Sequence, residues 1–191
     1  MSDLRINPEV ARKILTGWIH AEITRTGLKR AVVGLSGGLD SALSCFLAAE
    51  ALGPENVLAL RMPYRTSSQD SLEDARLVIE ATGVQSKTIE ITPMVEPFFE
   101  LFPDMNDLRR GNIMARMRMI VLFDQSADFE GLVGGTGNKT EILLGYTTVY
   151  GDSACALNPL GDLYKTQVRQ LATAMGLPAS ILTKAPSADL W

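Results

Sequence analysis

The sequence predicts an α/β fold of three layers, in which a doubly wound, mostly parallel sheet carries helices on both faces. The main observation is that strand-like and helix-like apolar periods alternate along the chain, with glycines at the expected helix ends. Repeated strand–helix–strand crossovers imply parallel strands. The 191 residues, 46% of them hydrophobic, can bury a core between such layers. We therefore expect a single domain over residues 1–191.

The first expected element is a helix that begins at Pro8. Asn7 and Pro8 read as an N-cap followed by proline at the first helical position. Gly27 supplies the stop. The apolar side chains that fall on one face of this helix are Val10, Ile14, Leu15, Trp18 and Ile19.

The remaining elements continue the alternation of short apolar segments and helical patterns. Gly53 and Gly83 end the second and third expected helices. The expected strands cover residues 30–35, 57–62, 85–91 and 132–134. The expected helices cover residues 41–52, 69–82, 93–125 and 164–175.

Charge and hydropathy restrict the kind of partner. A net charge of −4 argues against a surface that coats nucleic acid and against a polybasic membrane anchor. No apolar run approaches the roughly 20 residues of a spanning helix, and the N-terminus lacks a signal-like pattern. We therefore expect a cytoplasmic protein whose partners are small molecules, with no nucleic acid and no membrane among them.

The cysteines and the histidine carry no predicted chemistry. Cys45 and Cys155 are too few and too far apart for a disulfide framework or a thiolate zinc site, which favours two reduced structural thiols. His20 lies in the first helical pattern without a catalytic partner nearby in the sequence, so we expect a surface or packing role.

The segment between the first expected strand and the following helix predicts phosphate binding. It consists of Gly34, Leu35, Ser36, Gly37, Gly38, Leu39, Asp40 and Ser41. Adjacent glycines let backbone amides approach an anion, and the next helix N-terminus adds free N–H donors. Ser36 and Ser41 offer hydroxyl groups, whereas Asp40 repels phosphate unless a divalent cation lies between them. Asp40 therefore predicts magnesium.

The same segment excludes two common nucleotide-binding patterns. It lacks the lysine that follows the last glycine of a P-loop, and it lacks the three spaced glycines of the dinucleotide fingerprint. A tight turn followed by a helix cap is the structural alternative, which the position directly after a buried strand disfavours.

The motif SGGLDS resembles the pyrophosphate loop of the ATP-pyrophosphatase superfamily. This resemblance implies an adenine nucleotide alpha hydrolase-like fold and cleavage of ATP between its α- and β-phosphates. The superfamily includes NAD, GMP, asparagine and argininosuccinate synthetases, so this motif does not select the substrate.

The motif GNIMARMR at residues 111–118 is similar to a helical motif of NAD synthetases. The resemblance assigns Arg116 to deamido-NAD, since a guanidinium binds phosphate or carboxylate in a fixed fork. The roles of Asn112 and Arg118 stay open, and a solvated basic face is the alternative for Arg118. The apolar residues of this helix are expected to pack against the sheet or a partner subunit.

A second stretch, GGTGNKTE at residues 134–141 followed by LGYT at residues 144–147 and YGD at residues 150–152, resembles the ATP and nicotinate region of NAD synthetases. The resemblance gives Thr136 to ATP, Glu141 to magnesium beside Asp40, and Tyr146 to the nicotinate ring. Asp152 is the candidate acidic group beside the reacting carboxyl and the incoming ammonia. Ordinary packing for Tyr146 and a turn role for Asp152 are the alternatives. If the strands before the two glycine-rich loops are neighbours, the loops lie side by side.

Three further residues match ATP-contacting positions of NAD synthetases. Lys165 is expected to face the α-phosphate, where a cation stabilises charge that develops during adenylation. Ser187, in the segment KAPSADL, offers a hydroxyl group. Arg61 ends the strand that seats the adenosine in relatives.

The resemblance is incomplete at two positions and at the C-terminal end. Val149 and Ala156 stand where many relatives have lysine and aspartate for deamido-NAD, and Asn158 is a candidate replacement. The chain ends at Trp191, before a C-terminal region of the family. No nitrilase-like amidase precedes the domain, so free ammonia is the expected nitrogen donor.

The resemblance thus predicts an ammonia-dependent ligase of NAD biosynthesis. Its co-substrate is ATP, its cofactor is Mg²⁺, its catalytic residues are Asp152 and Lys165, and its assembly is a homodimer. Deamido-NAD is amidated through an acyl-adenylate, which yields NAD, AMP and pyrophosphate. Another ATP pyrophosphatase, such as a GMP synthetase core, and a non-catalytic ATP-binding module are the alternatives.

Overall fold

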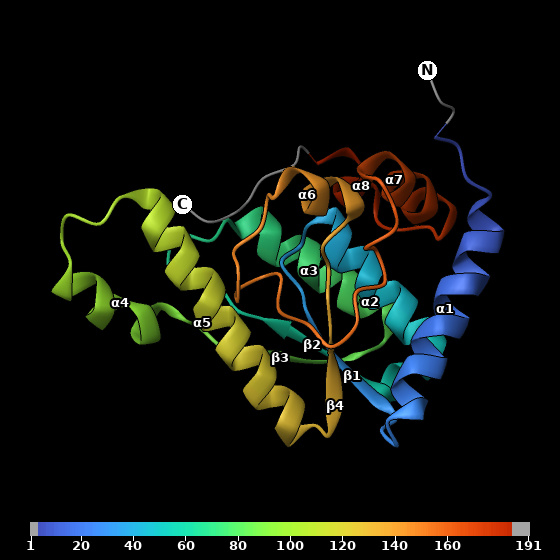
Figure 1. Cartoon of the computed structure of the whole chain (residues 1–191), viewed down its shortest axis with the longest axis horizontal. Coiled ribbons are helices and arrows are strands. Elements are labelled where there is room, and N and C mark those ends of the chain that lie inside the picture. Colours follow the sequence, from blue (N-terminus) through green and yellow to red (C-terminus); the bar gives the residue numbers. More distant parts are fainter. Residues whose placement is uncertain (1–3, 185–191) are drawn as a thin grey trace.

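The protein is an α/β structure in which a parallel sheet separates two layers of helices (Figure 1). The computed structural model describes residues 4–184. The strands are β1 (Arg30–Gly34), β2 (Val57–Arg61), β3 (Gln85–Thr88) and β4 (Gly131–Gly134). The helices are α1 (Pro8–Arg25), α2 (Leu39–Leu52), η1 (Pro54–Asn56), α3 (Gln69–Thr82), α4 (Thr92–Leu101), α5 (Asp107–Asp128), α6 (Lys139–Leu144), α7 (Lys165–Ala174) and α8 (Ala179–Thr183).

The sheet has the order β3-β2-β1-β4, and each pair of neighbouring strands is parallel. Its two centre strands are β2 and β1. From β1 the chain continues to β2 and β3 on one side and returns to β4 on the other side. The strand order therefore reverses beside β1, and this is the place where open α/β sheets bind their ligands. The predicted fold class is confirmed.

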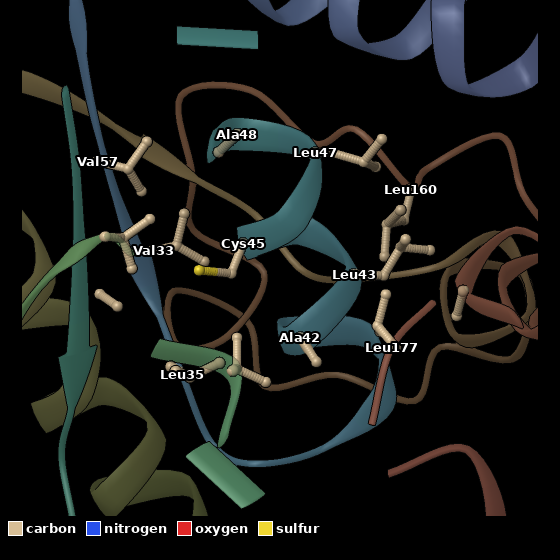
Figure 2. Close-up of a cluster of buried hydrophobic side chains, with 14 of the residues drawn as sticks. Val33, Leu35, Ala42, Leu43, Cys45, Leu47, Ala48, Val57, Leu160 and Leu177 are labelled. Atoms are coloured by element: carbon tan, nitrogen blue, oxygen red, sulfur yellow. The ribbon is translucent and has the colours of Figure 1, made fainter. Parts of the chain in front are cut away.

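Alternate side chains of β1 enter two different cores. Ala31 and Val33 pack with α1, α2, α7 and α8 on one face of the sheet. Figure 2 shows Cys45 and Ala48 of α2 near Val33 and Val57 of the sheet, with other side chains of α2 toward Leu160 and Leu177. Val32 points to the other face, where α4 and α5 supply the cover. Three layers thus follow from the alternation of β1 side chains.

Helix capping follows the sequence pattern. The Asn7 side chain accepts a hydrogen bond from the Val10 N–H, and Pro8 follows at the start of α1. In the same way Ser68 caps α3, and Gly83 ends α3 in the left-handed conformation at φ 69°. Such local signals explain why the bounds of α3 agree with the prediction.

The expected helical region over residues 93–125 is two helices, α4 and α5. Asn106 caps α5 by accepting a hydrogen bond from the Arg109 N–H at 3.0 Å, so a new helix begins there. The short helices α6 and α8 were not predicted, because five or six residues are too few to display a helical period. The strand expected over residues 85–91 ends earlier, at Thr88.

The apolar face expected on α1 divides into a buried stripe and an exposed one. Ile19 and Ile23 are buried in the core beside α2 and α7. In contrast, Val10, Ile14 and Trp18 are exposed, with 50%, 63% and 37% of their surfaces accessible. None of the helices in the described part of the chain is both long and apolar enough to span a membrane.

Candidate active site

A cavity of about 480 Å³ opens at the carboxyl ends of β1, β2 and β4. Val33 of β1 pairs in register with Gly134 of β4, so the loops that follow these strands lie side by side, as the sequence predicted. The predicted site residues that line this cavity are Gly34, Leu35, Ser36, Gly38, Asp40, Ser41, Arg61, Thr136, Glu141, Tyr146 and Asp152. The fold therefore brings most of the predicted site together.

The loop after β1 presents free backbone donors at the start of α2. Gly38 is the N-cap of α2, and no side chain caps this helix. The Ser36 and Ser41 hydroxyl oxygens lie 3.1 Å apart, and the Ser36 hydroxyl oxygen also accepts a hydrogen bond from the Gly38 N–H at 3.3 Å. An uncapped helix N-terminus beside two hydroxyl groups is suited to a phosphate group.

Gly37 gives the loop its shape rather than a surface toward the cavity. Its φ of +81° is unfavourable for residues with a side chain, and a Cβ there would lie 2.2 Å from the Ser71 carbonyl oxygen of α3. Leu39 is buried in the core with 7% of its surface accessible. Neither residue lines the cavity. Their assignment to ATP binding therefore stays a prediction, in which they contribute through the backbone of the loop.

The carboxylate of Asp40 lies between a cation and an amide. The ammonium group of Lys165, at the first position of α7, is hydrogen-bonded to Asp40 Oδ2. The Asn138 Nδ2 donates to Asp40 Oδ1 at 3.0 Å. Lys165 itself does not line the cavity, and it reaches the site through Asp40.

Asp40 and Glu141 are the two acidic groups that the sequence assigned to magnesium, and both line the cavity. Among residues 4–184 no cluster of three or more potential ligands could enclose a metal ion. Two carboxylates beside a phosphate-binding loop nevertheless fit magnesium, because this ion takes few protein ligands and completes its shell with phosphate oxygens and water. The residues present therefore fit the expected cation.

Burial raises the pKa of the Glu141 carboxyl, and the negative charge of Asp40 raises it further. The backbone N–H of Asn138 and the charge of Lys165 act in the opposite direction. The negative charges of these two partly buried carboxylates repel each other. A bound cation would relieve this repulsion, so this part of the cavity favours a cation.

Asp152 is held at the other end of the cavity by neighbours in its own loop. Its Oδ1 accepts a hydrogen bond from the Thr148 N–H at 2.7 Å, and its Oδ2 accepts one from the Thr147 hydroxyl at 3.0 Å. The buried Thr148 hydroxyl bonds in turn to Asn112 Oδ1 of α5 at 2.7 Å. This chain of contacts ties Asp152 to the helix that carries Arg116.

The residues predicted for deamido-NAD lie at the rim. Tyr146 lines the cavity with 64% of its surface accessible. Arg116 does not line the cavity, and its Nε donates to the Val149 carbonyl oxygen at 3.2 Å. Asn158 also lies outside the lining, next to Gly135. Ser187 lies outside the described residues.

Two guanidinium groups, those of Arg61 and Arg118, line the cavity. Arg118 lines the cavity and donates from Nε to the Met62 carbonyl oxygen at 3.0 Å, so the solvated basic face considered for it is wrong. The Nε of Arg61 is buried and has no hydrogen-bond partner among residues 4–184.

The sequence indicated no role for Asn138 or Thr148, and it left the role of Arg118 open. Asn138 carried a readable signal, because asparagine followed three residues later by glutamate is a helix-start pattern. Thr148 carried none, since its hydroxyl contacts Asn112, which is distant in the sequence. Arg118 belongs to the motif GNIMARMR, but its contact with Met62 also joins distant segments.

Known proteins have sequences similar to this chain over its whole length. The NH(3)-dependent NAD(+) synthetase of Trichlorobacter lovleyi is 62% identical over 191 residues, which are 100% of this chain and 70% of the relative. That of Chlorobium phaeovibrioides is 54% identical over 100% of this chain and 69% of its own length.

Solved structures agree with the sequence comparison. NMN synthetase from Francisella tularensis superimposes with a TM-score of 0.93 at 34% identity, over 98% of this chain and 78% of that one. NH3-dependent NAD synthetase from Campylobacter jejuni, in complex with the nitrate ion, gives 0.89 at 38% identity, over 93% and 77%. The sequence model of the family described as NAD synthase matches residues 11–191. With the two glycine-rich loops, the acidic pair and Asp152 around one cavity, the chain belongs to the NAD synthase family.

Proposed function

We propose that the protein is a ligase that forms a C–N bond, amidating deamido-NAD with ammonia while ATP is cleaved to AMP and pyrophosphate. The observation that carries this proposal is the convergence of a phosphate-type loop, the pair Asp40 and Glu141, and Asp152 on one cavity. A carboxylate is a poor acyl donor to ammonia until it is activated, so a reaction of this kind needs both a nucleotide site and a group that handles the amine proton.

The first step is adenylation. An oxygen of the nicotinate carboxylate attacks the α-phosphorus of ATP, and the bond to the bridging oxygen of the β-phosphate breaks. The N-terminus of α2 and the hydroxyl groups of Ser36 and Ser41 are placed to bind the departing pyrophosphate. Lys165 stabilises the charge that grows on the phosphates, since a fixed cation is most effective where charge develops.

Asp40 and Glu141 are the residues that would hold magnesium. When bound, this ion neutralises phosphate charge and aligns the phosphate oxygens. The carboxylates themselves contribute a local negative potential at the edge of a loop that otherwise attracts anions. Mg²⁺ as the cofactor is part of the proposal.

The second step is amidation. The ammonia nitrogen attacks the acyl carbon, the bond between that carbon and the AMP oxygen breaks, and a proton leaves the nitrogen. Asp152 is placed to orient ammonium and to accept this proton. Its two oxygens are already directed by the Thr148 N–H and the Thr147 hydroxyl, so the carboxylate enters the reaction with a fixed orientation.

Deamido-NAD would extend from the cavity across its rim. Tyr146 offers an exposed ring for stacking on the nicotinate. Replacement of Asn158 by alanine should weaken deamido-NAD binding in a titration, and an unchanged affinity would remove Asn158 from the substrate site.

A homodimer is the assembly that we propose. Exposed apolar side chains continue from α6 into the following loop, namely Ile142, Leu143, Leu144, Val149 and Tyr150. Such a patch next to a substrate rim suits a partner subunit. Light scattering should give the mass of a dimer for the wild type and of a monomer for Leu143→Glu. A monomeric wild type would contradict the proposed dimer.

The location of the protein in the cytoplasm stays a prediction.

The decisive assay measures pyrophosphate and NAD in mixtures of protein, ATP and Mg²⁺, with and without deamido-NAD and ammonium chloride. We expect pyrophosphate release that depends on deamido-NAD, and NAD that depends on both substrates. Glutamine in place of ammonium should give no NAD. Pyrophosphate release that does not depend on deamido-NAD would contradict the proposed function.

A second substrate has to be compared because NMN synthetase from Francisella tularensis has the same fold, with a TM-score of 0.93. An enzyme that makes NMN by amidation would accept nicotinic acid mononucleotide. The same assay with this mononucleotide identifies the preferred substrate, through the ratio of kcat/KM for deamido-NAD to kcat/KM for the mononucleotide. We expect deamido-NAD to be preferred, in line with the 62% identity to an NH(3)-dependent NAD(+) synthetase.

A further inference from the structure

Asn138 is the polar side chain with the least accessible surface in the described core, at 0%. It begins α6 and lies between Asp40 and Glu141, the two carboxylates of the proposed cation site. The N–H donors and the carbonyl acceptor of a buried amide side chain both need hydrogen-bond partners. The partners of Asn138 therefore indicate its role.

Asn138 makes three contacts with these two acidic residues. Its Nδ2 donates to Asp40 Oδ1 at 3.0 Å, and its backbone N–H donates to Glu141 Oε2 at 3.1 Å. Its Oδ1 accepts a hydrogen bond from the Glu141 N–H at 3.1 Å. One residue thus bonds a carboxylate oxygen of each acidic group and also anchors the backbone of the second.

Helix capping explains only part of this arrangement. Serine, threonine and aspartate cap helices as well as asparagine does, because a cap needs an acceptor oxygen alone. None of these side chains carries the amide donor that asparagine directs at Asp40. Capping of α6 therefore does not account for the hydrogen bond from Asn138 to Asp40.

We propose that Asn138 is a positioning residue that fixes Asp40 and Glu141 relative to each other for a divalent cation. This inference rests on the proposed function of the same site. By holding one oxygen of each carboxylate, the amide and the N–H of Asn138 direct the remaining oxygens without adding a charge. Neutral hydrogen-bond donors behind metal-binding carboxylates are the usual way in which proteins set ligand orientation.

The test separates metal binding from helix capping. Asn138→Ser keeps an acceptor for the Glu141 N–H and removes the donor to Asp40. Asn106→Ser is the matched control, because Asn106 caps α5 by the same type of bond, accepted from the Arg109 N–H at 3.0 Å, and does not line the cavity. Binding of Mn²⁺ in the presence of α,β-methylene-ATP is measured by electron paramagnetic resonance, and thermal unfolding is followed in parallel.

We expect Asn138→Ser to weaken Mn²⁺ binding by about 10–100-fold, the usual effect of losing a residue that orients metal ligands. The Asn106→Ser protein should bind Mn²⁺ like the wild type. The KM for Mg²⁺ should rise more than kcat falls, so high Mg²⁺ concentrations restore part of the turnover. If Asn138→Ser does not fold, Asn138→Thr keeps the cap and fills more of the space.

The proposal is overturned if the folded Asn138 variants bind Mn²⁺ like the wild type and lose only thermal stability. It is also overturned if the wild type with the nucleotide analogue does not bind Mn²⁺. Failure of the proposed function has a different signature, namely a wild type that binds Mn²⁺ and nucleotide but makes no NAD.

Discussion

Lys165 of α7 forms an ion pair with Asp40 of α2, although 125 residues separate them in the sequence. Asp40 is the carboxylate proposed for magnesium, and Lys165 is the cation proposed for phosphate. In this structure the two groups satisfy each other. If ATP binds with magnesium as proposed, we expect this ion pair to open, so that the Lys165 ammonium moves to phosphate and the Asp40 carboxylate receives the ion.

Lys165→Met tests this exchange. The variant removes the cation that competes for Asp40, so Mn²⁺ binding without nucleotide should become tighter. Pyrophosphate release should fall by about 10²–10³-fold, as when one electrostatic stabiliser of a transition state is lost. Lys13→Met, on the exposed part of α1, is the control and should change neither quantity. Weaker metal binding in Lys165→Met would argue against the exchange.

Asp152→Asn tests the division of labour between the two steps. Adenylation does not need the carboxylate of Asp152, so exchange of labelled pyrophosphate into ATP should persist when deamido-NAD is present. NAD formation should fall by about 10²–10⁴-fold, the usual contribution of a group that transfers a proton. Equal losses of exchange and of NAD formation would place Asp152 in substrate binding instead.

Gly37→Ala tests the shape of the phosphate loop. A Cβ at this position would lie 2.2 Å from the Ser71 carbonyl oxygen, and the φ is +81°. Gly176→Ala is the matched control, because its φ is +72° with no atom within 4 Å of the added Cβ. Both variants should lose about 1–2 kcal/mol through backbone strain. Gly37→Ala should lose more and should bind ATP at least about tenfold more weakly.

The two variants are compared by chemical unfolding and by nucleotide titration. Unchanged ATP affinity in Gly37→Ala would mean that α3 moves aside at Ser71 without disturbing the loop. The comparison with Gly176→Ala separates that outcome from general destabilisation, since only Gly37 belongs to the loop that follows β1.

Lys184→Met tests a partly buried ion pair that joins the C-terminal part of the described chain to α3. Asp74 is buried, and its oxygens bond to Lys184 Nζ at 2.8 Å and to the Ser180 hydroxyl at 2.7 Å. Removing the lysine leaves a buried carboxylate without its cation but with the Ser180 bond, so the free energy of unfolding should fall by about 1–3 kcal/mol. Urea unfolding measures the loss.

The exposed pair of Arg76 and Glu73 on the same helix is the comparison. Arg76→Gln should destabilise the protein much less than Lys184→Met does, because solvent screens the pairs of Arg76 with Glu73 and Glu80. A Lys184→Met protein as stable as Arg76→Gln would show that the Asp74 pair does not contribute through its burial.

Cys45 predicts a dependence of stability on alkaline pH. Burial raises the pKa of its thiol to about 12, from the ordinary value of 9.0. Above pH 9 the unfolded chain releases this proton while the folded protein retains it, so the free energy of unfolding falls as the pH rises toward 12. Between pH 9 and 10.5 the loss should be about 2 kcal/mol. Cys45→Ala should lack this component of the slope, and equal slopes for the two proteins would contradict the assignment.

The local structure and the chemistry of single loops could be predicted from the amino-acid sequence alone. Asn7 with Pro8, Ser68 and Gly83 identified helix ends, because caps depend on residues within one turn. The segment from Gly34 to Ser41 indicated phosphate for the same reason, since its glycines, hydroxyl groups and helix start are contiguous.

Which of these local features lie in contact depends on how the elements pack together. The position of β1 between β2 and β4 brings Asp40 to Asn138, Glu141 and Lys165, and pairing across such distances depends on the burial of the whole sheet. In the same way, α1 packs on α2 and α7 so that Ile19 is buried in the core and Ile14 is exposed. A helical period states that an apolar face exists, but only the neighbouring elements determine which part of that face they cover.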